Sequence, residues 1–236
     1  MKLARSLAAL LAFPALAQEA PESPWLTDHE LARSRARNER RDLLMVFLGP
    51  AAAGGNAAIE RDVLGSKDFT NDALQRFVLA RFDYPEPASK LPDALQRENE
   101  RLLRKYESPE LPVVWLEDQS GTVYARLGYV PVGGKPFLAM LDSRREAAKQ
   151  ASATLARAAG LSGIARAQAL AEGLRHLDDH VVALAHYREM LEIIQTDADG
   201  AAGLKAEFDA IARDAAMRPL RTRMQSELEP RIAEQA

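Results

Sequence analysis

Hydrophobic and polar residues follow one another in short blocks along the first part of the chain. Continuous apolar runs at Leu43–Leu48 and Phe77–Phe82 predict strands that are covered on both faces. A third run, Val113–Leu116, leads through the turn residues Asp118–Gly121 into a returning segment, Thr122–Leu127. Because Asp and Gly tolerate the backbone angles of a tight turn, the last two segments should form an antiparallel hairpin.

The polar segments between these runs carry the signals of helices. Thr27 and Glu30 have the spacing of a capping box, so a charged helix should begin there and end near Arg41. Asp93 is expected to cap another helix that ends near Tyr106. Further helices are expected over residues 57–64, 70–75 and 137–158. Helices that alternate with strands and end in a hairpin predict an α/β fold, a three-layer domain with a mixed central sheet.

Strand signals stop after Gly160, and the pattern is helical from there to the end of the chain. Polar residues or Pro219 separate helical windows over residues 164–177, 181–194, 203–216 and 220–233. We therefore expect an α/β domain over residues 25–158, followed by a small all-α C-terminal region over residues 161–236.

The N-terminus has the pattern of an export signal. Met1–Arg5 is basic, Ser6–Pro14 is apolar, and Ala15–Ala17 forms an A-x-A cleavage site. The apolar run is too short to span a bilayer. We therefore expect residues 1–17 to be removed as a signal peptide. This leaves a linker over residues 18–24 and a periplasmic or secreted protein without a membrane attachment.

Composition narrows the chemistry further. The 236 residues include 31 basic and 34 acidic side chains, so no basic excess points to nucleic acid as a partner. The chain contains no cysteine. Disulfides, and any chemistry that depends on a thiolate, are therefore excluded. No feature of the sequence indicates an oligomeric state.

The stretch Gly49–Glu60, GPAAAGGNAAIE, resembles the active-site segment of exported bacterial thioredoxin-like proteins, which reads like G-S-x-W-C-x-W-C-x-x-L-E. In this alignment Ala53 stands at the first cysteine and Asn56 at the second. Pro112 matches the cis-proline of the family. Leu127–Tyr129 ends a hairpin that fits the family pattern D-x-x-G-x-x-x-x-R-x-G-Y. The resemblance implies that the α/β domain is a thioredoxin-like domain.

The resemblance also implies a binding groove that has lost its redox chemistry. In the family, a thiolate is stabilised at a helix N-terminus, but Ala53 has nothing to ionise and Asn56 cannot resolve a mixed disulfide. The family also holds an extended peptide beside the cis-proline, in the manner of strand addition. We therefore expect a redox-inactive binding or chaperone-like module with a protein or peptide partner. Its groove would be formed by Ala53, Gly54, Gly55, Asn56, Leu111, Pro112, Gly128 and Tyr129.

Three other hypotheses stay open. The small-residue loop can be a structural relic without a ligand. The chain can instead be an enzyme that uses non-thiol chemistry in the same cleft, through Glu60, Asp62 or Tyr129. A strongly raised pKa of one of these carboxylates would favour this hypothesis. Alternatively, the helical region binds partners and the α/β domain serves as a scaffold. In each case we expect no cofactor.

Two histidines and one acidic stretch have spacings that partly match metal sites. His29 is expected at the solvated surface. His176 and His180 have a zinc-compatible spacing, but Asp178–Asp179 should break the helix between them. Asp197–Gly200 resembles the start of a calcium loop but lacks the glutamate at the twelfth position, so a helix-capping turn is the simpler interpretation. We therefore expect no metal site.

Overall fold

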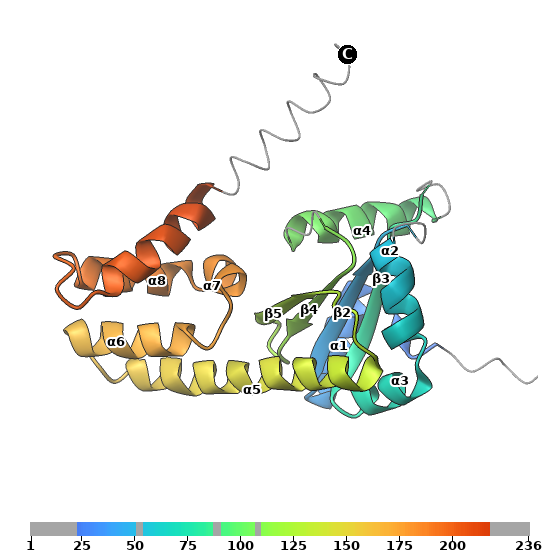
Figure 1. Ribbon diagram of the computed structural model, residues 1–236, viewed down its shortest axis with the longest axis horizontal. Helices are drawn as coiled ribbons and strands as arrows, with labels where there is room; N and C mark the ends of the chain where they lie inside the picture. The colour runs from blue at the N-terminus through green and yellow to red at the C-terminus, as the bar shows by residue number, and fades with distance from the viewer. Residues whose placement is uncertain (1–22, 51–53, 87–90, 107–109, 218–236) are drawn as a thin grey trace, which may run out of the picture.

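The computed structural model describes residues 23–50, 54–86, 91–106 and 110–217 (Figure 1). Its strands are β1 (Trp25–Leu26), β2 (Asp42–Leu48), β3 (Phe77–Asp83), β4 (Val113–Glu117) and β5 (Val123–Gly128). They form one sheet in the order β1-β3-β2-β4-β5. β1 and β2 pair parallel with β3, whereas β4 runs antiparallel to both β2 and β5. The sheet is therefore mixed, as the sequence predicts.

β2 lies in the middle of the sheet, and this position explains its continuous apolar sequence. Successive side chains of a strand point to opposite faces, so a strand that is covered on both faces must be apolar throughout. Alternate residues of β2 belong to two different cores, Leu44, Val46 and Leu48 to one and Leu43, Met45 and Phe47 to the other.

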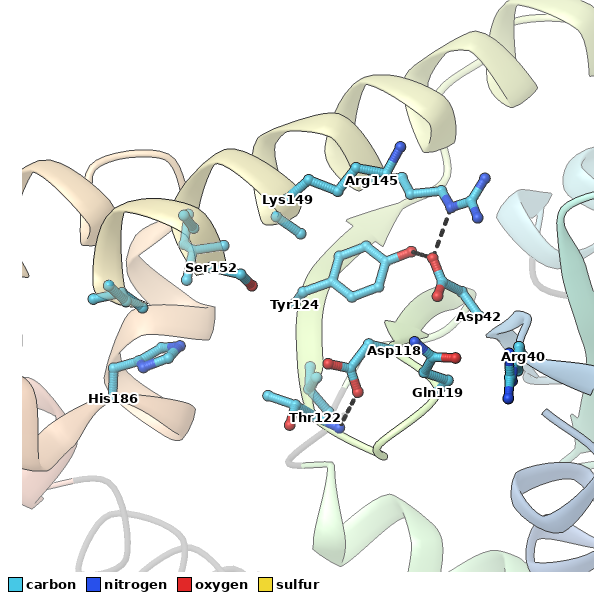
Figure 2. Close-up of a pocket in the computed structure, with 15 residues that line it drawn as sticks. Arg40, Asp42, Asp118, Gln119, Thr122, Tyr124, Arg145, Lys149, Ser152 and His186 are labelled. Carbon is cyan, nitrogen blue, oxygen red and sulfur yellow. Dashed lines mark hydrogen bonds and ion pairs between the residues drawn. The ribbon is translucent and has the colours of Figure 1, made fainter. Parts of the chain in front are cut away.

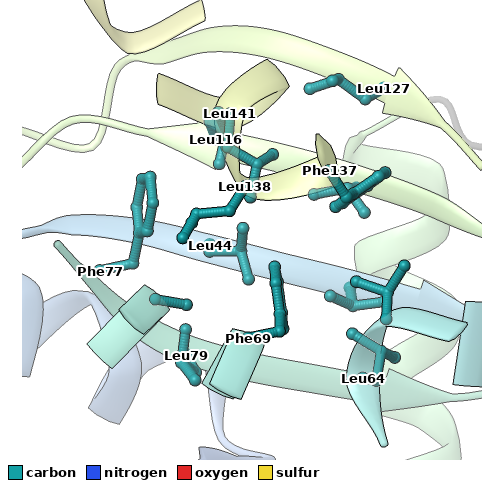
Figure 3. Close-up of a cluster of buried hydrophobic side chains, with 14 of the residues drawn as sticks. Leu44, Leu64, Phe69, Phe77, Leu79, Leu116, Leu127, Phe137, Leu138 and Leu141 are labelled. Atoms are coloured by element: carbon teal, nitrogen blue, oxygen red, sulfur yellow. The ribbon is translucent and has the colours of Figure 1, made fainter. Parts of the chain in front are cut away.

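Helices cover both faces of this sheet. α1 (His29–Glu39) and α4 (Asp93–Lys105) pack on the core that contains Phe47. The core that contains Leu44 is covered by α2 (Gly54–Ile59), the π-helix η1 (Glu60–Leu64), α3 (Lys67–Leu74) and α5 (Gly134–Ala158). In this second core the rings of Phe69 and Phe137 lie 6.2 Å apart, above the sheet (Figure 3).

The C-terminal region is helical. It contains α6 (Gly163–Leu174), α7 (Asp179–Ala185), α8 (Tyr187–Thr196) and a helix over residues 204–217. Leu170, Met190 and Phe208 from these helices meet in a third core. Among the described helices, none is both long and apolar enough to cross a membrane.

α5 connects the sheet to this region (Figure 1). It has 25 residues, and at 1.5 Å per residue it is about 37 Å long. Phe137 and Leu141 near its start belong to the core over the sheet, whereas Leu155 and Ala158 near its end pack in the third core. α7 adds another attachment, since the ring of His180 lies 5.3 Å from Trp115 of β4.

Several helix ends differ from expectation. Asp28, rather than Thr27, caps α1, because its Oδ1 accepts the amide of Leu31 at 2.8 Å. Pro92 precedes α4, and Asp93 is its first residue rather than its cap. The helix expected over residues 181–194 is divided at His186 into α7 and α8.

β1 was not expected from the sequence, because two residues are too few to show a periodicity. It pairs with β3 through Trp25 and Leu26. The expected signal peptide over residues 1–17 and the helix over residues 220–233 lie outside the described residues.

Candidate functional site

The peptide bond between Leu111 and Pro112 is cis and leads directly into β4. Gly55, in the first turn of α2, faces this proline, since a Cβ added to Gly55 would lie 3.2 Å from Pro112 Cδ. The cis configuration expected of Pro112 is confirmed, and the loop before β4 touches the helix that follows β2. The strand order β1-β3-β2-β4-β5, with a cis-proline directly before β4, identifies the fold of the α/β domain.

The α/β domain has a thioredoxin-like fold. The thioredoxin-like fold places the β2–α2 segment and the cis-proline on the same end of the sheet, because β2 ends there and the antiparallel β4 begins there. Ala53, the position of the first cysteine in the resemblance, lies outside the described residues.

Asn56 stands at the position of the second cysteine and has a structural contact there. Only 4% of the residue is exposed, and its Oδ1 accepts the amide of Gly49 at 2.7 Å. A Cβ added to Gly49 would lie 2.9 Å from Asn56 Nδ2 and 3.2 Å from Leu111 Cβ. Asn56 therefore joins the end of β2 to α2, and it keeps a buried amide hydrogen-bonded.

Gly54 and Gly128 leave open space around this contact. Among the described residues, no heavy atom lies within 4 Å of a Cβ added at either position. Gly128 is exposed and pairs with Val113 at the start of β4, so it lies one strand away from the cis-proline. The described groove residues are thus brought to one end of the sheet.

Tyr129 points to η1 rather than standing alone in the groove. Its hydroxyl donates to Asp62 Oδ2 at 2.9 Å, and Arg61 Nε donates to Asp62 Oδ1 at 2.6 Å. Hydrogen bonds from Arg61 and Tyr129 lower the pKa of Asp62. A carboxylate held in its ionised form is a poor proton donor near neutral pH, so this group does not supply the raised pKa that an acid–base enzyme would need.

A cavity of about 690 Å³ opens beside α2, on the side of Asn56 and Gly49. Leu48, Pro85 and Leu91 give it apolar walls. Arg81, Glu60 and Asp83 also line it. Arg81 Nη1 lies 2.9 Å from Glu60 Oε2, and Arg81 Nε lies 2.9 Å from Asp83 Oδ1. Its size falls within the range of about 300–1,000 Å³ that is usual for ligand sites.

A buried polar cluster on the other face of the sheet escaped sequence reasoning. His29 is 1% exposed, so its expected surface position is wrong. Its Nε2 lies 2.8 Å from the hydroxyl of Tyr106, which donates to the buried Glu117. Arg33 Nε donates to the same carboxylate at 2.9 Å. The signal was present in the sequence, because His29 shares the helical spacing of the buried residues Ala32 and Ala36.

Electrostatics in this cluster follow from burial. Burial raises the pKa of Glu117, and hydrogen bonds and charges from Tyr106, Arg33 and Lys105 oppose that rise. Burial also lowers the pKa of His29 to about 4. The cluster ties α1, the end of α4 and β4 together, and we assign it to stability.

Asp178, expected at a helix break, and Asp197, in the stretch that resembles a calcium loop, both accept backbone amides. Asp178 accepts the amide of Val181 at 2.8 Å at the start of α7. Asp197 is 1% exposed and accepts the amides of Ala202 and Lys205 at 2.8 and 3.0 Å. Among the described residues, no three or more His, Asp or Glu side chains are grouped so that they could hold a metal ion.

Comparison with known proteins finds similarity among solved structures only. No protein-family model and no curated protein matches the chain. A structure described as DsbH oxidoreductase is 18% identical with a TM-score of 0.48, covering 56% of this chain and 94% of its own. A thioredoxin from Thermus thermophilus is 20% identical with a TM-score of 0.39, over 50% of this chain and 83% of its own.

The C-terminal domain of DsbD from Neisseria meningitidis, in its oxidised form, is a further match. It is 16% identical with a TM-score of 0.38, over 51% of this chain and 98% of its own. With TM-scores below 0.5 these similarities carry no argument, and the fold is assigned from the strand order and the cis-proline.

Proposed function

We propose that this chain is a redox-inactive binding or chaperone-like module that holds an extended segment of a partner protein. The segment would lie in the groove at the loop between β2 and α2 and at the cis-proline loop. The contact of Gly55 with Pro112 is the observation that carries this proposal, because it preserves a peptide-binding frame although the chain has no cysteine.

Backbone pairing would supply much of the affinity. Within the part of the chain that the structure describes, no hydrogen bond joins the backbone of Leu111 to another residue. An extended backbone with unpaired amide and carbonyl groups can accept an added strand. A peptide that pairs with Leu111 would pass Gly54 and Gly128, where open space leaves room for its side chains.

Loss of redox chemistry supports binding rather than catalysis at this site. The similar structures include an oxidoreductase and a thioredoxin by name, but thiol–disulfide exchange needs a thiolate. This chain has none. A non-thiol enzyme in the same cleft has less support, because the pKa of Asp62 is lowered rather than raised.

The N-terminal pattern supports action outside the cytoplasm. Residues 1–17 combine a basic start, an apolar run and an A-x-A site. Expression of the full chain in a bacterial host tests this part of the proposal. Fractionation and N-terminal sequencing should yield a periplasmic or secreted chain that begins at Gln18. A cytoplasmic chain that retains Met1 would contradict export.

Bulky substitutions at the open glycines test the groove. Gly54→Trp and Gly128→Trp should preserve the fold, because each added side chain enters open space. The probe is a fluorescently labelled, chemically unfolded and alkylated polypeptide, and anisotropy reports its binding. We expect each substitution to raise Kd at least about tenfold, equivalent to about 1.4 kcal/mol.

Gly160→Trp, in the turn after α5, serves as the matched control. It adds the same side chain far from the cis-proline, and Kd should stay at the wild-type value. Equal affinity of all three variants and the wild type would overturn the groove as the binding site. Equal loss in all three would mean that the substitutions act through the fold.

A further inference from the structure

A separate cavity lies at the opposite end of the sheet from the groove (Figure 2). Asp42, the first residue of β2, lines this cavity, whereas Leu48, the last residue of β2, borders the groove end. At about 3.3 Å per residue, the two sites are about 20 Å apart. The cavity is therefore not part of the proposed peptide groove.

The cavity is built jointly by the sheet and the helical region. Its walls are the β4–β5 turn, the second half of α5, the segment before α7 and His186 between α7 and α8. Its volume is about 410 Å³, which fits a small organic molecule. Figure 2 shows Asp118, Ser152 and His186 pointing toward the same central space.

The two acidic residues of the cavity are already engaged. Asp42 Oδ2 accepts from Arg145 Nε at 2.8 Å and from the hydroxyl of Tyr124 at 3.1 Å. Asp118 Oδ1 accepts the amides of Ser120 and Thr122, both at 2.9 Å, and so holds the turn in shape. Arg145 therefore compensates the charge of Asp42, whereas the carboxylate of Asp118 is held in the turn by neutral hydrogen-bond donors.

Basic residues prevail at the rim. Arg40, Arg145 and Lys149 line the cavity, against the two acidic residues Asp42 and Asp118. Arg40 is exposed, and within the described part of the chain its guanidinium has no ion-pair partner. Lys149 pairs with Glu146 at 3.3 Å, and both side chains are largely exposed on α5.

The interior offers apolar contact, and His186 also borders it. Val123, Leu155 and Leu177 line it. Nδ1 of His186 is buried and has no hydrogen-bond partner within the described part of the chain. Glu189 Oε1 is 3.7 Å away from it, beyond hydrogen-bond distance.

We propose that this cavity binds a small organic anion. The cationic rim of Arg40, Arg145 and Lys149 holds its acidic group, and its body rests in the interior beside Leu155, Leu177 and His186. Because both parts of the chain form the walls, the bound anion also fixes the helical region against the sheet.

Titration of the full mature chain with sodium succinate, benzoate and phosphate tests this proposal. Amide chemical shifts in NMR spectra report binding, and sodium chloride at matched ionic strength is the reference. We expect at least one organic anion to shift the resonances of residues 118–124 and 177–186. Binding of phosphate alone, without succinate or benzoate, would assign the rim to inorganic anions and overturn the organic ligand.

Variants on α5 make the test specific. Lys149→Glu reverses a rim charge, and Ser152→Phe fills the interior from an exposed helical position. We expect each to weaken binding about tenfold or more, which corresponds to the loss of one charge-assisted hydrogen bond or of the apolar site. Lys135→Glu makes the same charge change on the same helix outside the cavity and should leave Kd unchanged.

Two outcomes would overturn the proposal. One is that no organic anion shifts the cavity resonances beyond the sodium chloride reference. The other is that Lys135→Glu weakens binding as much as Lys149→Glu does, because the effect would then reflect net charge. The peptide-binding assay on the groove is independent of both, so failure of either site leaves the other standing.

Discussion

At the scale of single residues, a few buried polar side chains join elements that are distant in the sequence. Glu117 is buried within an otherwise apolar strand, and it is stable there because Tyr106 and Arg33 both donate to it. Gly121 is part of the same arrangement. Its φ is 87°, and Arg33 Nη2 donates to its carbonyl at 2.9 Å. The charged helix α1 is thereby fixed to the β4–β5 turn.

Removal of the charge of Glu117 should weaken the fold. Glu117→Gln leaves Arg33 half-buried without its carboxylate, and hydrogen bonds to charged groups contribute about 1.5–3 kcal/mol. We expect the free energy of unfolding in urea to fall by about 2 kcal/mol. Glu172→Gln removes an exposed ion pair with Arg157 and should change it by less than about 0.5 kcal/mol. Equal losses of stability in the two variants would show that the buried ion pair stabilises the fold no more than the exposed one.

His29 should make stability depend on pH. Burial, followed by the charges of Lys105 and Arg33, lowers its pKa from 6.5 to about 4 in the folded chain, against the opposing effect of Glu30. Between these two values the unfolded chain binds a proton that the folded chain does not. The contribution of His29 to the free energy of unfolding is therefore complete above pH 6.5. It declines as the pH falls toward 4, by up to about 1.4 kcal/mol per pH unit.

His29→Gln isolates this effect. Urea unfolding at several pH values between 7 and 4.5 should show a shallower decline for the variant than for the wild type. Above pH 6.5 the difference in unfolding free energy between the variant and the wild type should no longer change with pH. Parallel curves over the whole range would contradict a neutral, buried His29.

At the scale of elements, Asn56 fixes the short helices on the groove side. α2 and η1 together span only Gly54–Leu64, and helices this short need tertiary contacts to persist. Asn56→Ala leaves the amide of Gly49 without its acceptor and should reduce the free energy of unfolding by about 1–3 kcal/mol. Hydrogen exchange of the α2 amides should also accelerate.

Asn71→Ala is the control for that prediction. Asn71 is exposed on α3, so its removal should leave the exchange of α2 unchanged. Protection of α2 that persists in Asn56→Ala would show that other contacts hold this segment.

The sequence predicts strands better than helix ends, for a physical reason. A strand covered on both faces needs an uninterrupted apolar run, as in Leu43–Leu48, and few other structures need one. Caps are less certain, because the neighbours Thr27 and Asp28 both have suitable oxygens and only the chain path selects one. The break between α7 and α8 at His186 was not predicted, because no Gly or Pro marks it in the sequence.

The candidate sites differ in the same way. Pro112 was predictable because its motif lies in one stretch of sequence, and the cis bond confirms it. The anion cavity was not predictable, because Asp42, Asp118, Lys149 and His186 come from distant segments. Only the way in which the helical region folds back brings them together.

At the scale of the whole molecule, α5 runs from the core over the sheet to the third core, and α7 adds a second attachment. Phe208 lies in the third core, which does not include residues of the sheet. Phe208→Ala should cost about 3–5 kcal/mol locally and raise hydrogen exchange over residues 163–217. Exchange in β2 and β3, and peptide binding at the groove, should stay at wild-type levels. Uniform acceleration across the sheet would show that the cores unfold as one unit.

α5 also constrains how the chain can change in length. Each residue of an α-helix turns the chain by about 100° and advances it by 1.5 Å. One residue inserted between Leu141 and Leu155 would therefore rotate the helical region by about 100°, just over a quarter of a revolution, around the axis of α5. The wall that carries Leu177 and His186 would leave the β4–β5 turn. To keep both walls of the cavity together, insertions or deletions between these points should come in near-whole turns.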